Sequence, residues 1–235
     1  MFSSVVSDGN GWLVVWEDHR NDPPEQLQGD IYGARVSPDG VSLDPEGFPI
    51  SVTDKFAVRP DVSHNGESAL VVWTGRAGAT HAYAARVARD GSVLDPDATQ
   101  LSFGAGGWVN TNNLSTRPIQ VDFDGSDWLV MWPHGQPGDQ SRYAALVGRD
   151  GRMLQLGPIE VPNGHLPFNL SHDGSSWMYV TTADHTITGR RIARDLTLLD
   201  EESLLIHVPP NRMFSPGIAC SATSSRKHRG FSSAQ

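Results

Sequence analysis

The chain has 235 residues, a net charge of −9 and 38% hydrophobic residues, and its 24 glycines and 16 prolines indicate a turn-rich protein with a full hydrophobic core. The acidic balance disfavours a surface that follows phosphates, so we expect no nucleic-acid partner. The sequence has no apolar stretch of 18 residues, which excludes a membrane-spanning helix, and the lone Cys220 excludes an intrachain disulfide framework.

One pattern occurs four times in succession. Its first half is a turn followed by an apolar run, as in SDGNGWLVVW from Ser7 and SHNGESALVVW from Ser63. Its second half is an alternating segment followed by a second turn, as in YGARVSPDGVSLDP from Tyr32. The glycines of the first turn are Gly9, Gly66, Gly125 and Gly174. A repeat of about 50 residues indicates a modular array.

Each copy is predicted to form four short strands. The first is brief, as at 60–63, and an Asp-Gly or Asn-Gly turn follows it. The second, as at 13–16, is apolar without alternation, so both of its faces should be buried. The third alternates over 31–36, and the fourth lies around 48–51. Small residues recur at one place of the third strand, where neighbouring sheets should approach closely: Gly33, Ala84 and Ala144.

Four antiparallel strands in about 50 residues are typical of a propeller blade. We predict an all-β fold, a β-propeller of four-stranded antiparallel blades, with four recognisable blades plus a remnant of a fifth. A β-solenoid is the main alternative, and the hairpin turns argue against it. The predicted boundaries are 1–220 for the propeller, blades at 3–56, 57–114, 115–164 and 165–210, a remnant at 211–220, and a disordered or non-native tail at 221–235.

The motif DG-x-x-x-LVVW followed by Y-[GA]-A-R-V-x-x-DG-x-x-LDP resembles bacterial exported repeat proteins of the myxobacterial type. The resemblance covers residues 3–208 and weakens in the fourth copy. It implies a β-propeller, placement in the secreted or cell-surface compartment and a mostly uncharacterised function. It supplies no catalytic motif. The chain shows no signal peptide, so the resemblance also implies a fragment of a longer repeat protein.

A looser resemblance links residues 171–177, SHDGSSW, to the Asp-box of sialidases and other propeller glycosidases. The segment lacks the residue between Asp and Gly, and its aromatic opens the second strand, whereas an Asp-box lies between the third and fourth. A propeller glycoside hydrolase or a lyase is therefore the alternative function. It would need carboxylates about 5 to 9.5 Å apart on one rim.

The densest polar cluster runs from Glu17 to Glu25, in the predicted connection between strands two and three of copy one. Asp18 and Arg20 are the candidate ligand-binding residues in it. In an enzyme, Glu17 or Asp18 would be an acid or base and Arg20 a clamp for a carboxylate. The alternative is a solvated loop in which an Asp–Arg pair holds the shape. The other copies lack the acidic residues at this place.

Tryptophan supplies the remaining candidate. Trp108 lies in a Gly- and Asn-rich link between copies two and three, where it could stack on a sugar ring or fill a gap against a neighbouring blade. A second set recurs three residues after the turn glycine, which predicts a packing role or a ring of equivalent sugar sites: Trp12, Trp128 and Trp177. Ala69 takes this place in copy two.

No cofactor is expected. The nine histidines form no His-x-His or His-Glu-x-x-His pattern, so no metal site is predicted. Calcium on the Asp-rich turns is the one metal left open, although no turn shows the D-x-D-x-D-G series of ligands.

The sequence thus predicts a binding or scaffolding module outside the cell, with a glycan, another polymer or a protein as ligand. Two end blades of an open arc would leave apolar faces uncovered, so self-association through those faces is expected. A truncated product with no function of its own is the third alternative.

Overall fold

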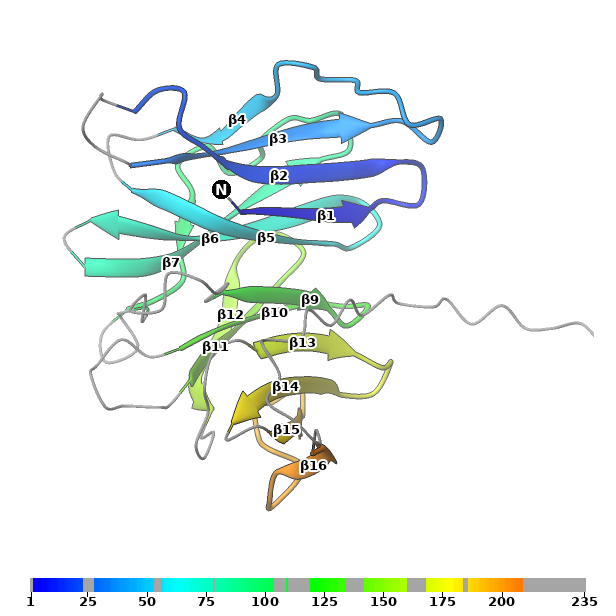
Figure 1. Ribbon diagram of the computed structural model, residues 1–235, viewed down its shortest axis with the longest axis vertical. Coiled ribbons are helices and arrows are strands. Elements are labelled where there is room, and N and C mark those ends of the chain that lie inside the picture. Colours follow the sequence, from blue (N-terminus) through cyan, green and yellow to red (C-terminus); the bar gives the residue numbers. More distant parts are fainter. Residues whose placement is uncertain are drawn as a thin grey trace, which may run out of the picture.

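The computed structural model describes residues 2–22, 28–52, 56–77, 79–103, 109, 119–133, 142–159, 168–183 and 186–208. Over these residues all regular structure is β: four antiparallel sheets of four strands follow one another along the long axis of the molecule (Figure 1). We call each sheet a blade. Within every blade the strands are hydrogen-bonded in chain order, so the first and fourth strands form its edges.

The bounds of the strands are as follows. Blade 1 contains β1 (Ser3–Ser7), β2 (Trp12–Asp18), β3 (Asp30–Val36) and β4 (Phe48–Ser51). Blade 2 contains β5 (Ala57–His64), β6 (Ser68–Ala77), β7 (Ala79–Ala88) and β8 (Thr99–Gln100). Blade 3 contains β9 (Gln120–Phe123), β10 (Trp128–Pro133), β11 (Arg142–Val147) and β12 (Met153–Ile159). Blade 4 contains β13 (Phe168–His172), β14 (Trp177–Ala183), β15 (Thr186–Ile192) and β16 (Leu204–His207).

The turn between the first two strands selects glycine through its backbone conformation. Its glycines have φ between +85° and +101°, and an added Cβ would meet nothing within 4 Å: Gly9, Gly66, Gly125 and Gly174. The left-handed region, not crowding, therefore explains the repeated glycine. The second turn shows the same requirement, because Leu196 adopts φ +65° where the other copies have glycine.

Neighbouring blades pack face to face through three separate hydrophobic cores. In β6 the side chains of Ala69, Val71 and Trp73 contribute to the core shared with blade 1, whereas Leu70 and Val72 contribute to the core shared with blade 3. The alternation of a strand thus supplies two interfaces. The third core joins blades 3 and 4, and its members include Leu129, Met131, Trp177, Tyr179 and Ile192.

This packing confirms the prediction of a second strand that is buried on both faces, but only for the inner blades. All described side chains of β6 and β10 are buried. In the end blades one face remains partly open, at Trp12, Val14 and Trp16 of β2 and at Met178 and Val180 of β14. An end blade has a neighbour on one side only, which accounts for the difference.

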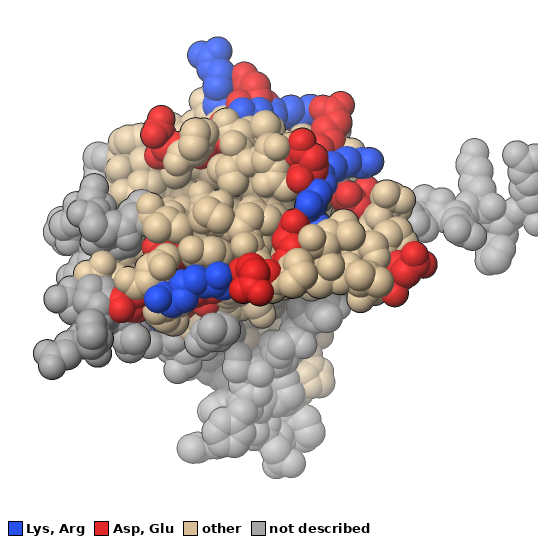
Figure 2. Space-filling model, turned by 90° about the horizontal axis from the view of Figure 1, so that it is seen from above, with Lys and Arg blue, Asp and Glu red and all other residues tan. Residues whose placement is uncertain are grey.

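The four blades form an open arc. No hydrophobic core among the described residues joins blade 1 to blade 4, and the two blades lie at opposite ends of the stack (Figure 1). Seen from the end that blade 1 forms, an uncharged area is flanked by bands of acidic and basic side chains (Figure 2). The β-propeller prediction is confirmed for four four-stranded blades. Residues 211–235, predicted as a blade remnant and a tail, lie outside the described residues.

The innermost strands are tied to one another by aspartates. Asp61 of β5 accepts a hydrogen bond from Ser4 Oγ of β1 at 2.8 Å and from the Val121 N–H of β9 at 3.0 Å. Asp122 of β9 accepts the His172 N–H of β13 at 2.6 Å, and burial raises the pKa of Asp122. Side-chain carboxylates therefore connect the inner edges of all four blades.

Two arginine positions in the second half of the repeat make contacts that recur from blade to blade. The first forms a staple in which an arginine donates its backbone N–H and its guanidinium to the aspartate of the LDP turn, which reads LDE in blade 4: Arg35–Asp44, Arg86–Asp95 and Arg191–Asp200. The second forms a latch from the second turn of one blade to the preceding blade: Arg89 to Asp8, Arg149 to Asn65 and Arg194 to Asp124. Blade 1 has Pro38 at the latch position.

Candidate functional site

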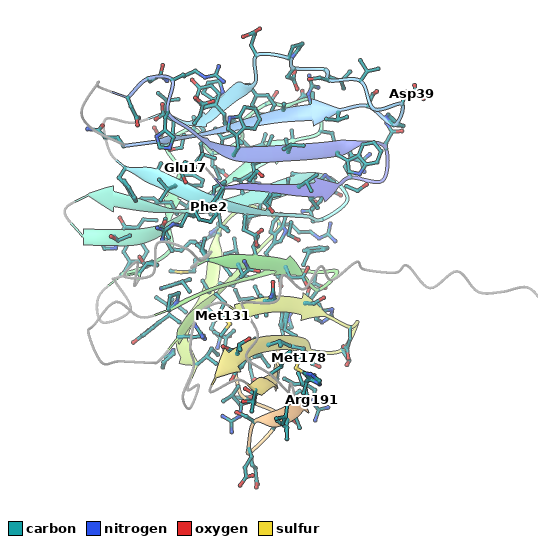
Figure 3. The ribbon with its side chains drawn as sticks, in the orientation of Figure 1. Phe2, Glu17, Asp39, Met131, Met178 and Arg191 are labelled. Atoms are coloured by element: carbon teal, nitrogen blue, oxygen red, sulfur yellow. The ribbon has the colours of Figure 1, made fainter. Side chains whose placement is uncertain are left out.

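The two ends of the strands form two different rims. Because consecutive strands are antiparallel, the turns after the first and third strands lie at one end of each blade, and the connections after the second and fourth strands lie at the other. We call these ends the turn rim and the loop rim. In blade 1 Asp39 marks the turn rim and Glu17 the loop rim, on opposite sides of the molecule (Figure 3).

Variation in length is concentrated at the loop rim. The connections between second and third strands are residues 19–29, 78, 134–141 and 184–185 in successive blades, and the links between blades are 52–56, 101–119 and 160–167. The first turns, by contrast, are three or four residues long: 8–11, 65–67, 124–127 and 173–176. The second turns are 37–47, 89–98, 148–152 and 193–203, so only that of blade 3 is clearly shorter. A rigid scaffold with variation on one side is typical of proteins that bind through loops.

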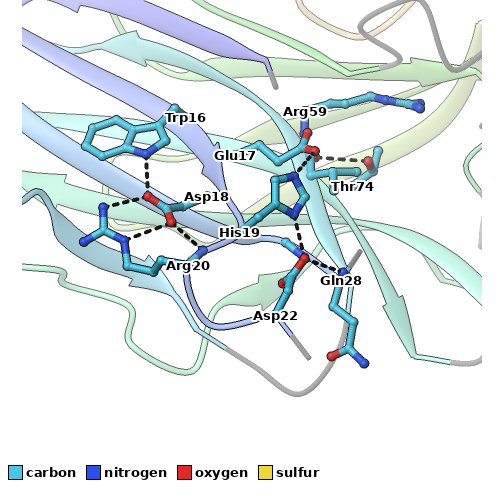
Figure 4. A network of polar contacts seen from close by, with 11 residues as sticks. Trp16, Glu17, Asp18, His19, Arg20, Asp22, Gln28, Arg59 and Thr74 are labelled. Atoms are coloured by element: carbon cyan, nitrogen blue, oxygen red, sulfur yellow. Dashed lines mark hydrogen bonds and ion pairs between the residues drawn. The ribbon is translucent and has the colours of Figure 1, made fainter. Parts of the chain in front are cut away.

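The predicted pair Asp18 and Arg20 lies at the loop rim of blade 1 and forms a closed ion pair (Figure 4). Asp18 Oδ1 accepts from the backbone N–H and Nε of Arg20, both at 2.9 Å. Asp18 Oδ2 accepts from Arg20 Nη2 at 2.7 Å and Trp16 Nε1 at 2.8 Å. These bonds, above all those from Arg20, lower the pKa of Asp18 to about 2. The geometry matches the alternative in which an Asp–Arg pair holds the shape of the loop. With this lowered pKa, the Asp18 carboxylate stays ionised at neutral pH.

Arg20 also covers the open face of blade 1. Its guanidinium lies 4.3 Å from the centre of the Tyr32 ring and donates to the Glu46 carbonyl at 2.8 Å. Glu17 and Asp18 were predicted to lie in the connection, but they are the last two residues of β2 and pair with Ile31 and Asp30. The strand continues because both side chains find partners at its end.

A second network, which the sequence did not reveal, is centred on His19 (Figure 4). The ring lies between two carboxylates, with Nε2 2.9 Å from Glu17 Oε1 and Nδ1 2.7 Å from Asp22 Oδ2. Burial disfavours the charged ring, but the bonds to Asp22 and Glu17 outweigh burial and raise the pKa of His19. Asp22 also accepts the backbone N–H groups of Gln28 and Gly29, each at 2.9 Å. The network therefore fixes both ends of the 19–29 connection.

Arg59, near the loop-rim start of β5, is the most unusual residue of this region. It is 4% exposed, has φ +56° and lies where the β5–β6 register shifts. Its backbone N–H donates to Glu17 Oε2 at 3.3 Å, its guanidinium lies 5.6 Å from the Phe2 ring, and its Nη1 has no hydrogen-bond partner. Burial lowers the pKa of Arg59. Pro60 was the available signal, since proline in a strand is found at an edge or at a bulge, and here the edge strand β5 carries both features.

The remaining candidate residues form no second site among the described residues. Trp108 lies outside the described residues, so its predicted role is not located. Within the described ranges no group of three His, Cys, Asp or Glu side chains is arranged to hold a metal ion. Over the same ranges no helix is long and apolar enough to cross a membrane.

The fold and its two rims define the chain as a β-propeller. Among solved structures it is similar to the subtype N10 neuraminidase-like protein of A/little yellow-shouldered bat/Guatemala, with TM-score 0.57 and 9% identity over 83% of this chain and 56% of that chain. The subtype N11 neuraminidase-like protein of A/flat-faced bat/Peru gives TM-score 0.52 and 9% identity over 83% and 50%. At such identities the likeness shows the fold alone.

Sequence comparisons assign no family. No protein-family model matches the chain. The mycothiol acetyltransferase of Kytococcus sedentarius is 28% identical over 128 residues, which cover 47% of this chain and 40% of that protein. The chain thus spans less than half the length of this relative, and the match is too low and too partial to show a shared family.

Proposed function

We propose that the chain is a β-propeller binding module that holds a glycan, another polymer or a protein on its loop rim. The observation that carries the proposal is the contrast between a turn rim whose first turns are all three or four residues long and a loop rim whose connections range from residue 78 alone to residues 101–119. The His19 network adds preorganisation, because an ordered connection loses little entropy when it binds.

Binding is favoured over catalysis by the state of the acidic groups. Both oxygens of Asp18 are occupied, and both ring nitrogens of His19 are bonded to carboxylates. A general acid or base needs a free position next to its substrate. Arg59 Nη1 in this region is a donor without a hydrogen-bond partner, but it is buried, so an oxygen-bearing group of a ligand would reach it only after neighbouring side chains move.

The resemblance of the repeats to exported bacterial proteins supports a place outside the cytoplasm, as does the near absence of cysteine. The uncovered faces of blades 1 and 4 support a role as part of a larger assembly, within a longer repeat chain or between copies.

The test is a binding screen followed by variants at the two rims. The protein would be screened against glycan, polysaccharide and polypeptide panels, and each ligand found would be titrated. Arg59→Met and the pair His19→Gln with Asp22→Asn change the loop rim, while Asp39→Asn changes an exposed turn-rim position as the control. The loop-rim variants should weaken binding at least about tenfold and the control should not. Equal weakening at both rims would contradict the proposal.

A further inference from the structure

A cavity of about 140 Å³ lies between blades 1 and 2 at the turn rim, away from the network described above. Its floor is formed by buried apolar side chains, Leu13, Ala69 and Val87. Exposed Leu43 and Arg89 lie at its mouth. The cavity is therefore apolar inside and open to solvent at a polar edge.

The repeat explains why the cavity exists. Ala69 pairs with His64 across strands β5 and β6. At the same register the other inner interfaces have a tryptophan that is completely or almost completely buried, Trp128 opposite Phe123 and Trp177 opposite His172. Blade 2 thus lacks an indole where blades 3 and 4 fill the interface with one.

The residues around Ala69 correspond to those around Trp128 and Trp177 in the other interfaces. Trp128 shares its core with Leu70 and Val147, and Trp177 shares its core with Leu129 and Ile192. The residues at the same repeat positions around the cavity are Leu13 and Val87. An aromatic platform is present as well: Phe123 lies 5.4 Å from Trp128 and His172 lies 5.0 Å from Trp177, centre to centre. In blade 2 the platform is His64, which lines the cavity.

We propose that this cavity is a binding site for a small, uncharged aromatic molecule of one or two fused rings, which packs against His64 as the tryptophans pack in the other interfaces. The size fits, because an enclosed apolar cavity of roughly 150 Å³ takes up benzene, and the apolar floor here belongs to a cavity of about 140 Å³. The inference does not depend on the function proposed for the loop rim, which lies at the other end of the blades.

The charges at the mouth favour a neutral ligand. Arg35 is paired with Asp44 at 2.8 Å, and Arg89 Nη2 donates to the carbonyl of Asp8 at 3.1 Å and to that of Gly66. His64 Nδ1 accepts the Gly66 N–H at 2.9 Å. Burial, assisted by Arg89, lowers the pKa of His64, so its ring is neutral at pH 7. The remaining charged side chains of the lining, Arg89 and Asp8, carry opposite charges, so the lining has no net charge that would favour a carboxylate or an ammonium group.

Indole is the probe, measured by isothermal titration and by ligand-observed NMR. The wild-type protein should bind one indole saturably at up to millimolar concentration, and indole should raise its melting temperature. Ala69→Trp places an indole in the cavity, so it should abolish the binding and raise the melting temperature without ligand. Ser126→Trp adds an exposed tryptophan to a first turn of the turn rim and should bind indole as the wild type does.

Ala69→Leu is the second filling variant, because leucine occupies part of the space with less risk of overpacking. It should weaken indole binding at least about tenfold. No saturable binding by the wild type, or undiminished binding by the filled variants, would overturn the proposal. Binding lost equally in Ser126→Trp would overturn it too, because the site would then lie elsewhere.

Discussion

At the scale of single residues, the loop rim of blade 1 is held by charges that satisfy one another. His19 is the only member of the network that changes its charge near neutral pH. Its bonds to Asp22 and Glu17 form best with the protonated ring, which is why the pKa of His19 is raised in the folded state.

The sign of the resulting pH dependence follows from linkage. A raised folded-state pKa means that the stabilisation by His19 is fully present below the unfolded value of about 6.5 and is lost as the pH rises through the folded value. We expect the free energy of unfolding of the wild type to exceed that of His19→Gln at pH 5.5 and the difference to shrink by pH 8.5. Urea unfolding at several pH values measures it, and NMR titration of the ring gives the pKa. A difference that grows with pH would contradict the assignment.

At the scale of the element, the arginine staple gives the LDP turn its fixed shape. Arg86 and Asp95 are both about one-fifth exposed, and Asp95 accepts three hydrogen bonds from Arg86. Blade 3 replaces both members at once, since Leu146 pairs with Gln155 in the same register. Simultaneous replacement indicates that either residue alone would leave an unsatisfied partner.

This comparison within one chain predicts the outcome of a double-mutant cycle. Asp95→Gln alone should cost about 1 to 3 kcal/mol, because the Arg86 guanidinium loses its charged acceptor. The pair Arg86→Leu with Asp95→Gln, which copies blade 3, should recover a large part of that loss. Asp90→Asn, in the exposed second turn, serves as the control and should change stability by less than about 0.5 kcal/mol. Additive effects of the two single changes would refute the coupling.

Much of the blade was predictable from the sequence, since glycine turns, the apolar second strand and small residues in the third strand follow from local geometry. The staples and latches were not, because Arg35 and Asp44 meet only after β3 and β4 pair. The site was less predictable still. Asp18 and Arg20 were found from charge density, whereas the roles of His19 and Arg59 depend on contacts between the end of β2 and the start of β5.

At the scale of the whole molecule, position in the array decides what an equivalent residue contributes. Trp12, Trp128 and Trp177 occupy one place in the repeat, yet Trp12 is 41% exposed and the other two are at most 1% exposed. Their positions in the sequence repeat are the same. Their exposed fractions differ because the arc is open and blade 1 has no neighbour on that side.

We therefore expect unequal costs from the same substitution. Trp128→Ala should destabilise by about 3 to 5 kcal/mol, because it removes a large side chain from a filled core. Trp12→Ala should cost about 1 kcal/mol or less, since Trp12 is 41% exposed and no other blade among the described residues packs on its outer face. Thermal and urea unfolding of the two variants measure the difference. Equal losses would mean that the face of blade 1 is covered in solution.

The outer end of blade 4 carries the apolar surface of the arc. Leu204, Leu205 and Ile206 of β16 are 41%, 64% and 51% exposed. Arg191 projects at the same end, in the position that receives the next turn in the first two blades. We expect concentration-dependent self-association in sedimentation velocity, and Leu205→Lys should reduce it without lowering the melting temperature. Exposed Asp39→Asn at the other end, which also raises the net charge by one, is the charge-matched control. A wild type that stays monomeric at high concentration would contradict this expectation.

Asp61 gives the arc a property that stacked modules usually lack. Repeat arrays commonly exchange energy only between adjacent units, so a terminal unit can unfold while units two places away are undisturbed. Here one carboxylate receives its bonds from the strands on either side of its own, β1 and β9. Opening of blade 1 would remove the Ser4 hydrogen bond that helps to hold the Asp61 carboxylate in place for the Val121 N–H of blade 3. Amide protons of β9 should therefore exchange faster when β1 frays, although the two strands belong to sheets that are not neighbours.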